Sequence, residues 1–138
     1  MPYIVADVLR GQHISTDEQL IRIVNYSLNL TRGLKPVATI RISIRDTEYE
    51  DTSRGDGQYD AFMKALWKIY DRLGRQHPRL VDYKVSIPPG GKTDALVETV
   101  IVWDNNGQEL RTRGLDADQT EAAIKATVKM LNIIEKQI

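Results

Sequence analysis

The chain has 138 residues, which suits one domain of ordinary size and is too short for a barrel of roughly 250 residues. Of these residues 41% are apolar and 28% are charged, a composition typical of a globular domain. Lys plus Arg equals Asp plus Glu at 19 each, which removes the strongest sequence argument for binding to nucleic acid or to an anionic membrane. The sequence has no cysteine, so disulfides, thiolate zinc sites and a cysteine nucleophile are excluded.

The N-terminal segment predicts a short helix. In Ile14–Leu20 a serine and a threonine stand ahead of acidic residues, which is the pattern of a helix N-cap. The apolar residues Leu20, Ile21 and Val24 follow at helical spacing. We therefore expect residues 1–24 to form a linker that contains one helix.

Further along the chain, apolar and polar residues alternate as they do in strands with one buried face. The expected strands are Tyr26–Thr31, Val37–Arg45, Glu48–Thr52, Leu80–Ile87, Ala95–Trp103 and Glu109–Arg113. The Asn106-Gly107 pair between the last two strands is a strong hairpin signal.

Two segments show the three- and four-residue apolar spacing of amphipathic helices. The first is Gln58–Leu73, which Gly74 should end. The second is Ala117–Glu135. Its expected buried residues are Ala122, Ala123, Ala126, Met130, Leu131 and Ile134.

One sequence pattern occurs twice. Gln58–Ala65 reads QYDAFMKA and Gln119–Ala126 reads QTEAAIKA, an offset of 119 − 58 = 61 residues, and Lys68 matches Lys129 at the same offset. A fixed offset indicates one supersecondary unit used twice. We therefore expect an α+β fold of two tandem, pseudo-symmetric units, each with three antiparallel strands followed by one helix that packs on the sheet.

The two repeats are expected at residues 25–74 and 80–136. In the second repeat the strand Ala95–Trp103 is apolar on both faces. One of these faces needs a cover from outside the chain, so the sequence predicts a homodimer.

Metal binding and catalysis have little support. His13 and His77 lie in different segments, without the spacing of paired ligands, and read as surface loop residues. The acidic cluster Asp46–Asp51 reads as a solvated face. We expect no metal, no cofactor and no catalytic residue.

Met1–Leu9 does not resemble a signal peptide and no apolar run reaches about 18 residues, so we expect a cytoplasmic protein without a membrane partner.

Two Gly/Asp-rich junctions, Arg54–Gln58 and Arg113–Gln119, lead from a strand into a helix start. Backbone N–H groups at a helix start favour a carboxylate or a phosphate, and glycine allows a ligand to approach closely. An amino acid suits these junctions better than a nucleoside phosphate, because there is no GxxxxGK[ST] motif. The alternative is that Asp56, Asp116 and Asp118 simply cap the helices.

These junctions carry a family resemblance. Gly55–Ala61 reads GDGQYDA and resembles the signature GDGPVDA, and Gly114–Ala122 reads GLDADQTEA and resembles GVDTDIVEA. Both signatures belong to the C-terminal regulatory, leucine-sensing domain of α-isopropylmalate synthase, which citramalate synthases share. Gly90–Ala95 resembles the glycine-rich turn of that domain, so the resemblance covers nearly the whole chain.

The resemblance implies that residues 25–138 form a dimeric regulatory domain that binds an end-product amino acid and inhibits a catalytic barrel, present in cis or in trans. Leucine is the expected effector, with isoleucine as the alternative. Two departures from the family, Gln58 in place of proline and Gln119-Thr120 in place of an aliphatic pair, would change the shape of the pocket. The implied ligand contacts are Gly55, Gly57, Tyr59, Asp60, Ala61, Leu80, Asp82, Tyr83, Ile87, Ala117 and Asp118.

Two other classes of function stay open. A small stand-alone enzyme would need a nucleophile with its base or a metal cluster, and neither emerges from the sequence. A pure dimerisation module that binds no ligand is supported by the departures at Gln58 and Gln119.

Overall fold

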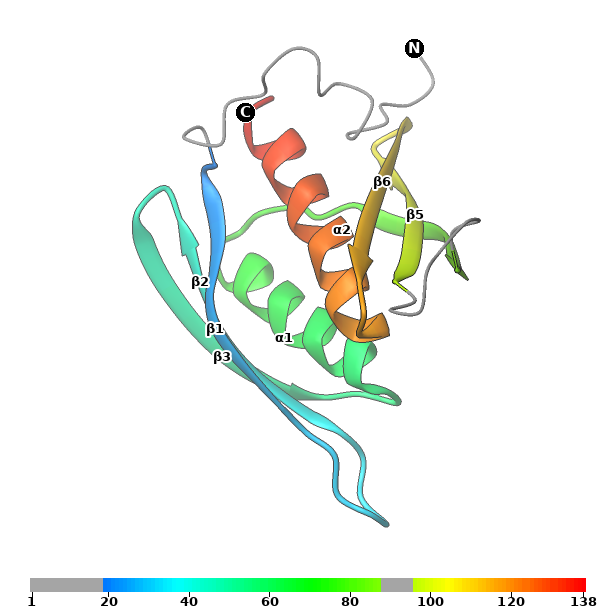
Figure 1. Cartoon of the computed structure of the whole chain (residues 1–138). Helices are drawn as coiled ribbons and strands as arrows, with labels where there is room; N and C mark the ends of the chain where they lie inside the picture. Colours follow the sequence, from blue (N-terminus) through cyan, green and yellow to red (C-terminus); the bar gives the residue numbers. More distant parts are fainter. Residues whose placement is uncertain (1–18, 88–95) are drawn as a thin grey trace. The chain divides into compact units, whose positions relative to one another are not determined.

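The computed structural model describes residues 19–87 and 96–138 (Figure 1). The described chain forms two compact units, which we call the first unit (Leu20–His77) and the second unit (from Pro78 to Ile138). Each unit consists of a three-stranded antiparallel sheet followed by one helix. The prediction of an α+β fold with two tandem βββα units is therefore confirmed.

The first unit contains a sheet in the order β1-β2-β3, with α1 lying along one face (Figure 1). The helix packs mainly on β2 and β3. The predicted inward face of β2, namely Ala38, Ile40, Ile42 and Ile44, is buried. The elements are β1 (Ile21–Asn29), β2 (Val37–Ile44), β3 (Thr47–Arg54) and α1 (Gln58–Arg72).

The helix expected over Leu20–Val24 is wrong in the part that the structure describes, because β1 begins at Ile21. Isoleucine and valine are β-branched and favour strands, and Ile21 gains a buried position opposite Ile44. A bulge after Ile23 then moves the inward-facing residues from odd to even positions. The alternation of apolar and polar residues that predicts a strand is therefore interrupted in the sequence. Residues 14–18 of the expected helix lie outside the described residues.

The second unit repeats this arrangement with a sheet in the order β4-β5-β6. Asn106 (φ 54°) and Gly107 (φ 90°) both lie in the left-handed region, as a type I′ hairpin turn requires, so the predicted hairpin is confirmed. The predicted core of α2 is buried except for Ile134, which is half-buried. The elements are β4 (Arg79–Ser86), β5 (Val97–Asn105), β6 (Gln108–Asp116) and α2 (Gln119–Glu135).

The two units share details that follow the offset found in the sequence. In each unit one lysine of the helix donates to a backbone carbonyl of the preceding strand. Lys68 Nζ donates to Thr52 O at 2.8 Å, and Lys129 Nζ donates to Arg113 O at 2.6 Å. Both the lysines and the carbonyls are 61 residues apart (129 − 68 and 113 − 52). The internal duplication is therefore present in the structure as well as in the sequence.

In the second unit α2 covers β5 and β6, while β4 forms an edge of the sheet. On β5 the helix-facing residues Ile101 and Trp103 are fully buried. Three apolar side chains at β4, Leu80, Val81 and Val85, are exposed. The exposed apolar surface of this unit thus includes the edge strand.

In the part of the chain that the structure describes, neither helix combines the length and the apolarity needed to cross a membrane.

Candidate functional site at the first helix start

The start of α1 is open. Gly57 is the N-cap residue, its backbone is extended (φ −143°), and no side chain caps the helix there. A Cβ added at Gly57 would meet no atom within 4 Å. The first N–H groups of a helix have no partner inside the helix, so this end of α1 presents donors to a region that Gly57 leaves unfilled.

The start of α2 is different, because it is capped by its own sequence. The Asp118 side chain accepts a hydrogen bond from Glu121 N at 3.0 Å. Asp116 Oδ1 in turn accepts from Asp118 N at 2.9 Å, and Lys125 pairs with Asp116 at 2.9 Å. The capping interpretation of the junctions therefore holds for α2. It fails for α1, where Asp56 pairs with Lys35 instead.

Two of the predicted contacts at the first junction are buried. Gly55 has no room for a side chain, since an added Cβ would lie 2.6 Å from the Ala61 Cα. Ala61 itself has no exposed surface. Gly57, Tyr59 and Asp60 are half-buried and remain accessible at the helix start. Close packing against α1 therefore accounts for the glycine at position 55. Of the contacts predicted at this junction, Gly57, Tyr59 and Asp60 are the ones that a ligand could reach.

Asp60 ties the glycine turn to the helix. Its Oδ2 accepts a hydrogen bond from Asp56 N at 2.8 Å and pairs with Lys64 Nζ at 3.1 Å. The bond from Asp56 N is the main reason why the pKa of Asp60 lies below its ordinary value, and Lys64 lowers it further. Sequence reasoning missed Lys35 and Lys64 as parts of this site, although Lys64 belongs to the repeated motif.

This lowered pKa predicts an effect of pH on stability. A carboxyl group with a lower pKa in the folded chain stabilises it above about pH 4, and this contribution disappears as the pH falls through the folded pKa. We expect Asp60→Asn to lower the free energy of unfolding at pH 7 by roughly 0.5 kcal/mol, because the carboxylate is partly exposed. The loss should shrink towards zero below the folded pKa.

Urea unfolding of both proteins between pH 2 and pH 7 would measure this dependence. Glu109→Gln is a matched control that removes an exposed carboxylate on β6. If Asp60→Asn and Glu109→Gln gave the same profile, Asp60 would have no special role in the glycine turn.

The remaining predicted contacts lie in the second unit. Tyr83 is the half-buried residue of β4, whereas Leu80, Asp82 and Ile87 are exposed. Successive residues of a strand point to opposite faces, so Asp82 and Tyr83 face opposite sides of their sheet. Ala117 and Asp118, the last two members of the predicted set, are exposed at the start of α2.

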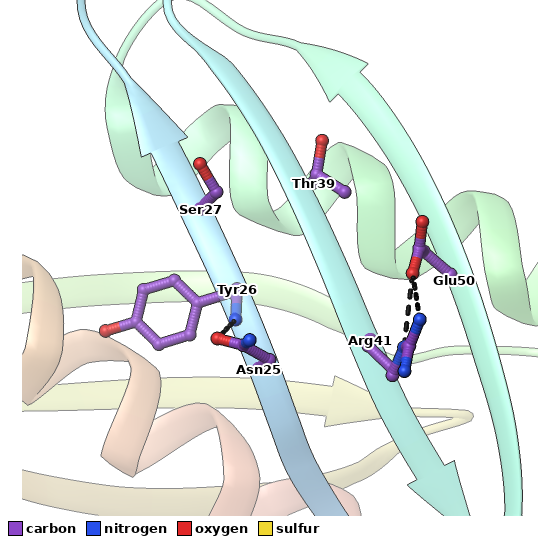
Figure 2. A pocket seen from close by; sticks show the side chains of 6 residues that line it. All are labelled: Asn25, Tyr26, Ser27, Thr39, Arg41 and Glu50. Carbon is purple, nitrogen blue, oxygen red and sulfur yellow. Dashed lines mark hydrogen bonds and ion pairs between the residues drawn. The ribbon is translucent and has the colours of Figure 1, made fainter.

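A hollow of about 260 Å³ lies on the first unit, on the sheet face away from α1 (Figure 2). Arg41 and Glu50 close one side of it with an ion pair of 3.0 Å, and Thr39 adds a hydroxyl. Tyr26 points away from these three side chains (Figure 2). The hollow is polar and includes none of the predicted contacts, so it offers no recess for an aliphatic side chain. Among the described residues, no three His, Asp or Glu side chains are grouped as metal ligands would be.

These features define the class of protein by its fold, which is a domain built from two βββα units. The family profile described as the LeuA allosteric (dimerisation) domain matches residues 3–135, and the chain belongs to this family. The resemblance inferred from the glycine motifs is thereby confirmed.

Three relatives show the extent of the similarity. The 2-isopropylmalate synthase of Aquifex aeolicus is 31% identical over 124 residues, which cover 88% of this chain and 23% of the relative. The 2-isopropylmalate synthase of Methylacidiphilum infernorum is 32% identical over 129 residues, which cover 93% of this chain and 24% of the relative. The probable 2-isopropylmalate synthase of Methanosarcina mazei is 31% identical over 137 residues, which cover 98% of this chain and 26% of the relative. The chain therefore spans about a quarter of the length of these relatives.

Proposed function

We propose that this chain is the leucine-binding allosteric domain of a 2-isopropylmalate synthase, and that leucine bound to it inhibits the synthase as the end product of leucine biosynthesis. The proposal rests on the contrast between the two helix starts. The sequence caps α2 with Asp118, but at α1 it places Gly57, which neither caps the helix nor fills the space above it. Such an end suits the carboxylate of a free amino acid.

The rest of an amino acid makes two further demands on a site. Its ammonium group needs acceptors, and Asp60 is already engaged by Lys64 and Asp56 N, so backbone carbonyls are the simpler partners. Its aliphatic side chain needs an apolar surface, which we assign to the half-buried ring of Tyr59 next to Gly57.

The proposed assembly is a homodimer that acts on a catalytic barrel in the cytoplasm. The apolar side chains of Leu80, Val81 and Val85 at the edge strand β4 support it, because a second copy would remove them from water. The family and the names of the relatives support the link to a synthase. Inhibition then requires two states of the assembly that differ in their affinity for leucine.

Thermal unfolding with added amino acids tests the proposal. Leucine at 100 times its dissociation constant should stabilise the folded chain by roughly 2.7 kcal/mol, which raises the midpoint by several degrees. Alanine is the control and should leave the midpoint unchanged.

The same experiment separates the alternatives. A larger shift with isoleucine than with leucine would indicate the sensing domain of a citramalate synthase. We expect valine, which has one methylene fewer than leucine, to bind more weakly by about ten- to a hundredfold, since one methylene is worth only about 1–3 kcal/mol. Isoleucine has the same atoms as leucine with another branching point, and we expect its different shape to weaken binding as well. No shift with any branched amino acid at millimolar concentration would contradict sensing and favour a dimerisation module.

A further inference from the structure

A second hollow of the first unit is lined by the hairpin that joins β1 to β2. Its volume is about 570 Å³, which is in the range of small-molecule sites. Its floor is one row across the sheet, in which Val37 of β2 pairs with Asn29 of β1 on one side and with Arg54 of β3 on the other. Residues paired in this way point to the same face of a sheet, so the three side chains line the hollow together.

The hairpin turn forms the wall of this hollow, and backbone hydrogen bonds hold the turn in place. Leu34 N donates to Thr31 O at 3.0 Å, and Gly33 between them lies in the left-handed region (φ 85°). Gly55 N donates to Pro36 O at 3.0 Å, which ties the hairpin to the end of β3. The wall is therefore fixed by the chain itself, and a ligand would not have to order it.

The charged part of the lining is positive. Of the described residues that line the hollow, Lys35 and Arg54 are cations and none is acidic. Lys35 Nζ pairs with Asp56 Oδ1 at 3.2 Å, but both side chains are largely exposed, so water and salt weaken this pair. The Arg54 side chain makes no hydrogen bond or ion pair with any described residue. Its guanidinium is free to bind an anion, and its planar fork matches the two oxygens of a carboxylate.

The apolar part of the lining consists of Leu34, which is 71% exposed, and the half-buried Val37. Contact with an aliphatic group would remove apolar surface of both residues from water, which an inorganic anion cannot do. An amino acid would bring its ammonium group close to two cations, with no carboxylate among the described lining residues to pair with it. The lining therefore suits an aliphatic acid that has no ammonium group.

We infer that this hollow is a second binding site of the first unit and that it takes a short aliphatic carboxylate without an ammonium group. Arg54 binds the carboxylate, Lys35 adds a second positive charge, and Leu34 and Val37 contact the aliphatic part. None of the described lining residues belongs to the start of α1, so the site is separate from the proposed leucine site and does not depend on it.

An NMR titration of the ¹⁵N-labelled chain with isocaproate, which is leucine without its ammonium group, tests the site. We expect saturable shifts of the amide signals of Gly33, Leu34 and Val37, with a dissociation constant of about a millimolar, as suits so small a ligand. Leucine and the neutral alcohol isohexanol should each bind at these signals roughly tenfold more weakly.

Two outcomes of this titration would overturn the inference. One is the absence of saturable shifts in the hairpin at isocaproate concentrations well above the millimolar range. The other is inorganic phosphate binding at the same signals as tightly as isocaproate, because the apolar wall would then contribute nothing. The signals of Gly57 and Tyr59 report on leucine at the start of α1, so failure of one site is distinguishable from failure of the other.

Arg54→Gln should weaken isocaproate binding about tenfold, as the loss of a charge-assisted hydrogen bond does. Arg32→Gln is the matched control, because Arg32 is an exposed arginine of the same hairpin that is not part of the lining. It should leave the affinity nearly unchanged. Equal losses in both variants would show only a general attraction of anions to a basic hairpin and would overturn the site.

Leu34→Ser tests the apolar contact and should weaken isocaproate binding about threefold. Leu30→Ser is its control, because Leu30 is also an exposed leucine of this hairpin but does not line the hollow. Both positions are on the surface, so the variants should fold like the unaltered chain. Unchanged affinity in Leu34→Ser would overturn the role of the apolar wall.

Discussion

Gly114→Ala is expected to lower the free energy of unfolding by about 2–3 kcal/mol and the thermal midpoint by about 10 °C. Gly114 lies in β6, fully under α2, and pairs in register with the buried residue Thr99. A Cβ there would collide with the Ala122 carbonyl oxygen and would lie 2.9 Å from Ala126 N. Both obstacles are helix backbone, so the helix itself must move away from the sheet.

Gly57→Ala is the control for this prediction, because it makes the same substitution where an added Cβ meets nothing and the backbone is extended. It should change the free energy of unfolding by less than about 0.5 kcal/mol. Chemical denaturation of both variants measures the difference. Equal stability of Gly114→Ala and the unaltered chain would mean that α2 does not lie as close to β6 as the structure places it.

Gly57→Val is expected to weaken leucine binding at least a hundredfold while the chain stays folded. The valine methyl groups would occupy the space above the first N–H groups of α1, where the proposal places the ligand carboxylate. A β-branched residue is compatible with the extended backbone of Gly57, and its poor capping should cost at most about 1 kcal/mol. Calorimetry with leucine measures the binding. Normal affinity in this variant would remove the start of α1 from the site.

Gly57→Ser gives a sharper version of the same test. A serine at this N-cap should accept a hydrogen bond from the helix start and stabilise the chain by a few tenths of a kcal/mol. The same hydroxyl would compete with the ligand carboxylate, so leucine should bind more weakly. A variant that is more stable yet binds less well points to the N–H groups themselves, whereas tighter binding would contradict the proposed role of the open helix end.

Much of the fold could be predicted from the sequence, because the signals were local. The alternation along Val37–Arg45, the Asn106-Gly107 turn and the repeated pattern that begins at Gln58 and at Gln119 each correspond to an observed element. The second helix was expected from Ala117 and begins two residues later, at Gln119. The strand at Ile21 could not be predicted in this way. Its register depends on pairing with Ile44 and on a bulge, and neither is visible in the local spacing.

The candidate site was predictable only in part. The glycine motif pointed to both helix starts alike, but which of them is capped depends on geometry that the sequence does not display. Asp56 and Asp118 are both acidic residues of the junctions, yet only Asp118 caps its helix.

The most direct test of the central claim is an NMR titration of the ¹⁵N-labelled chain with leucine, in which backbone amide signals are followed residue by residue. Our account predicts saturable shifts at Gly57, Gln58 and Tyr59, no such shifts with alanine, and an unmoved signal at the hairpin residue Gly107. The absence of shifts at the start of α1 with millimolar leucine, or saturable shifts confined to other parts of the chain, would contradict it.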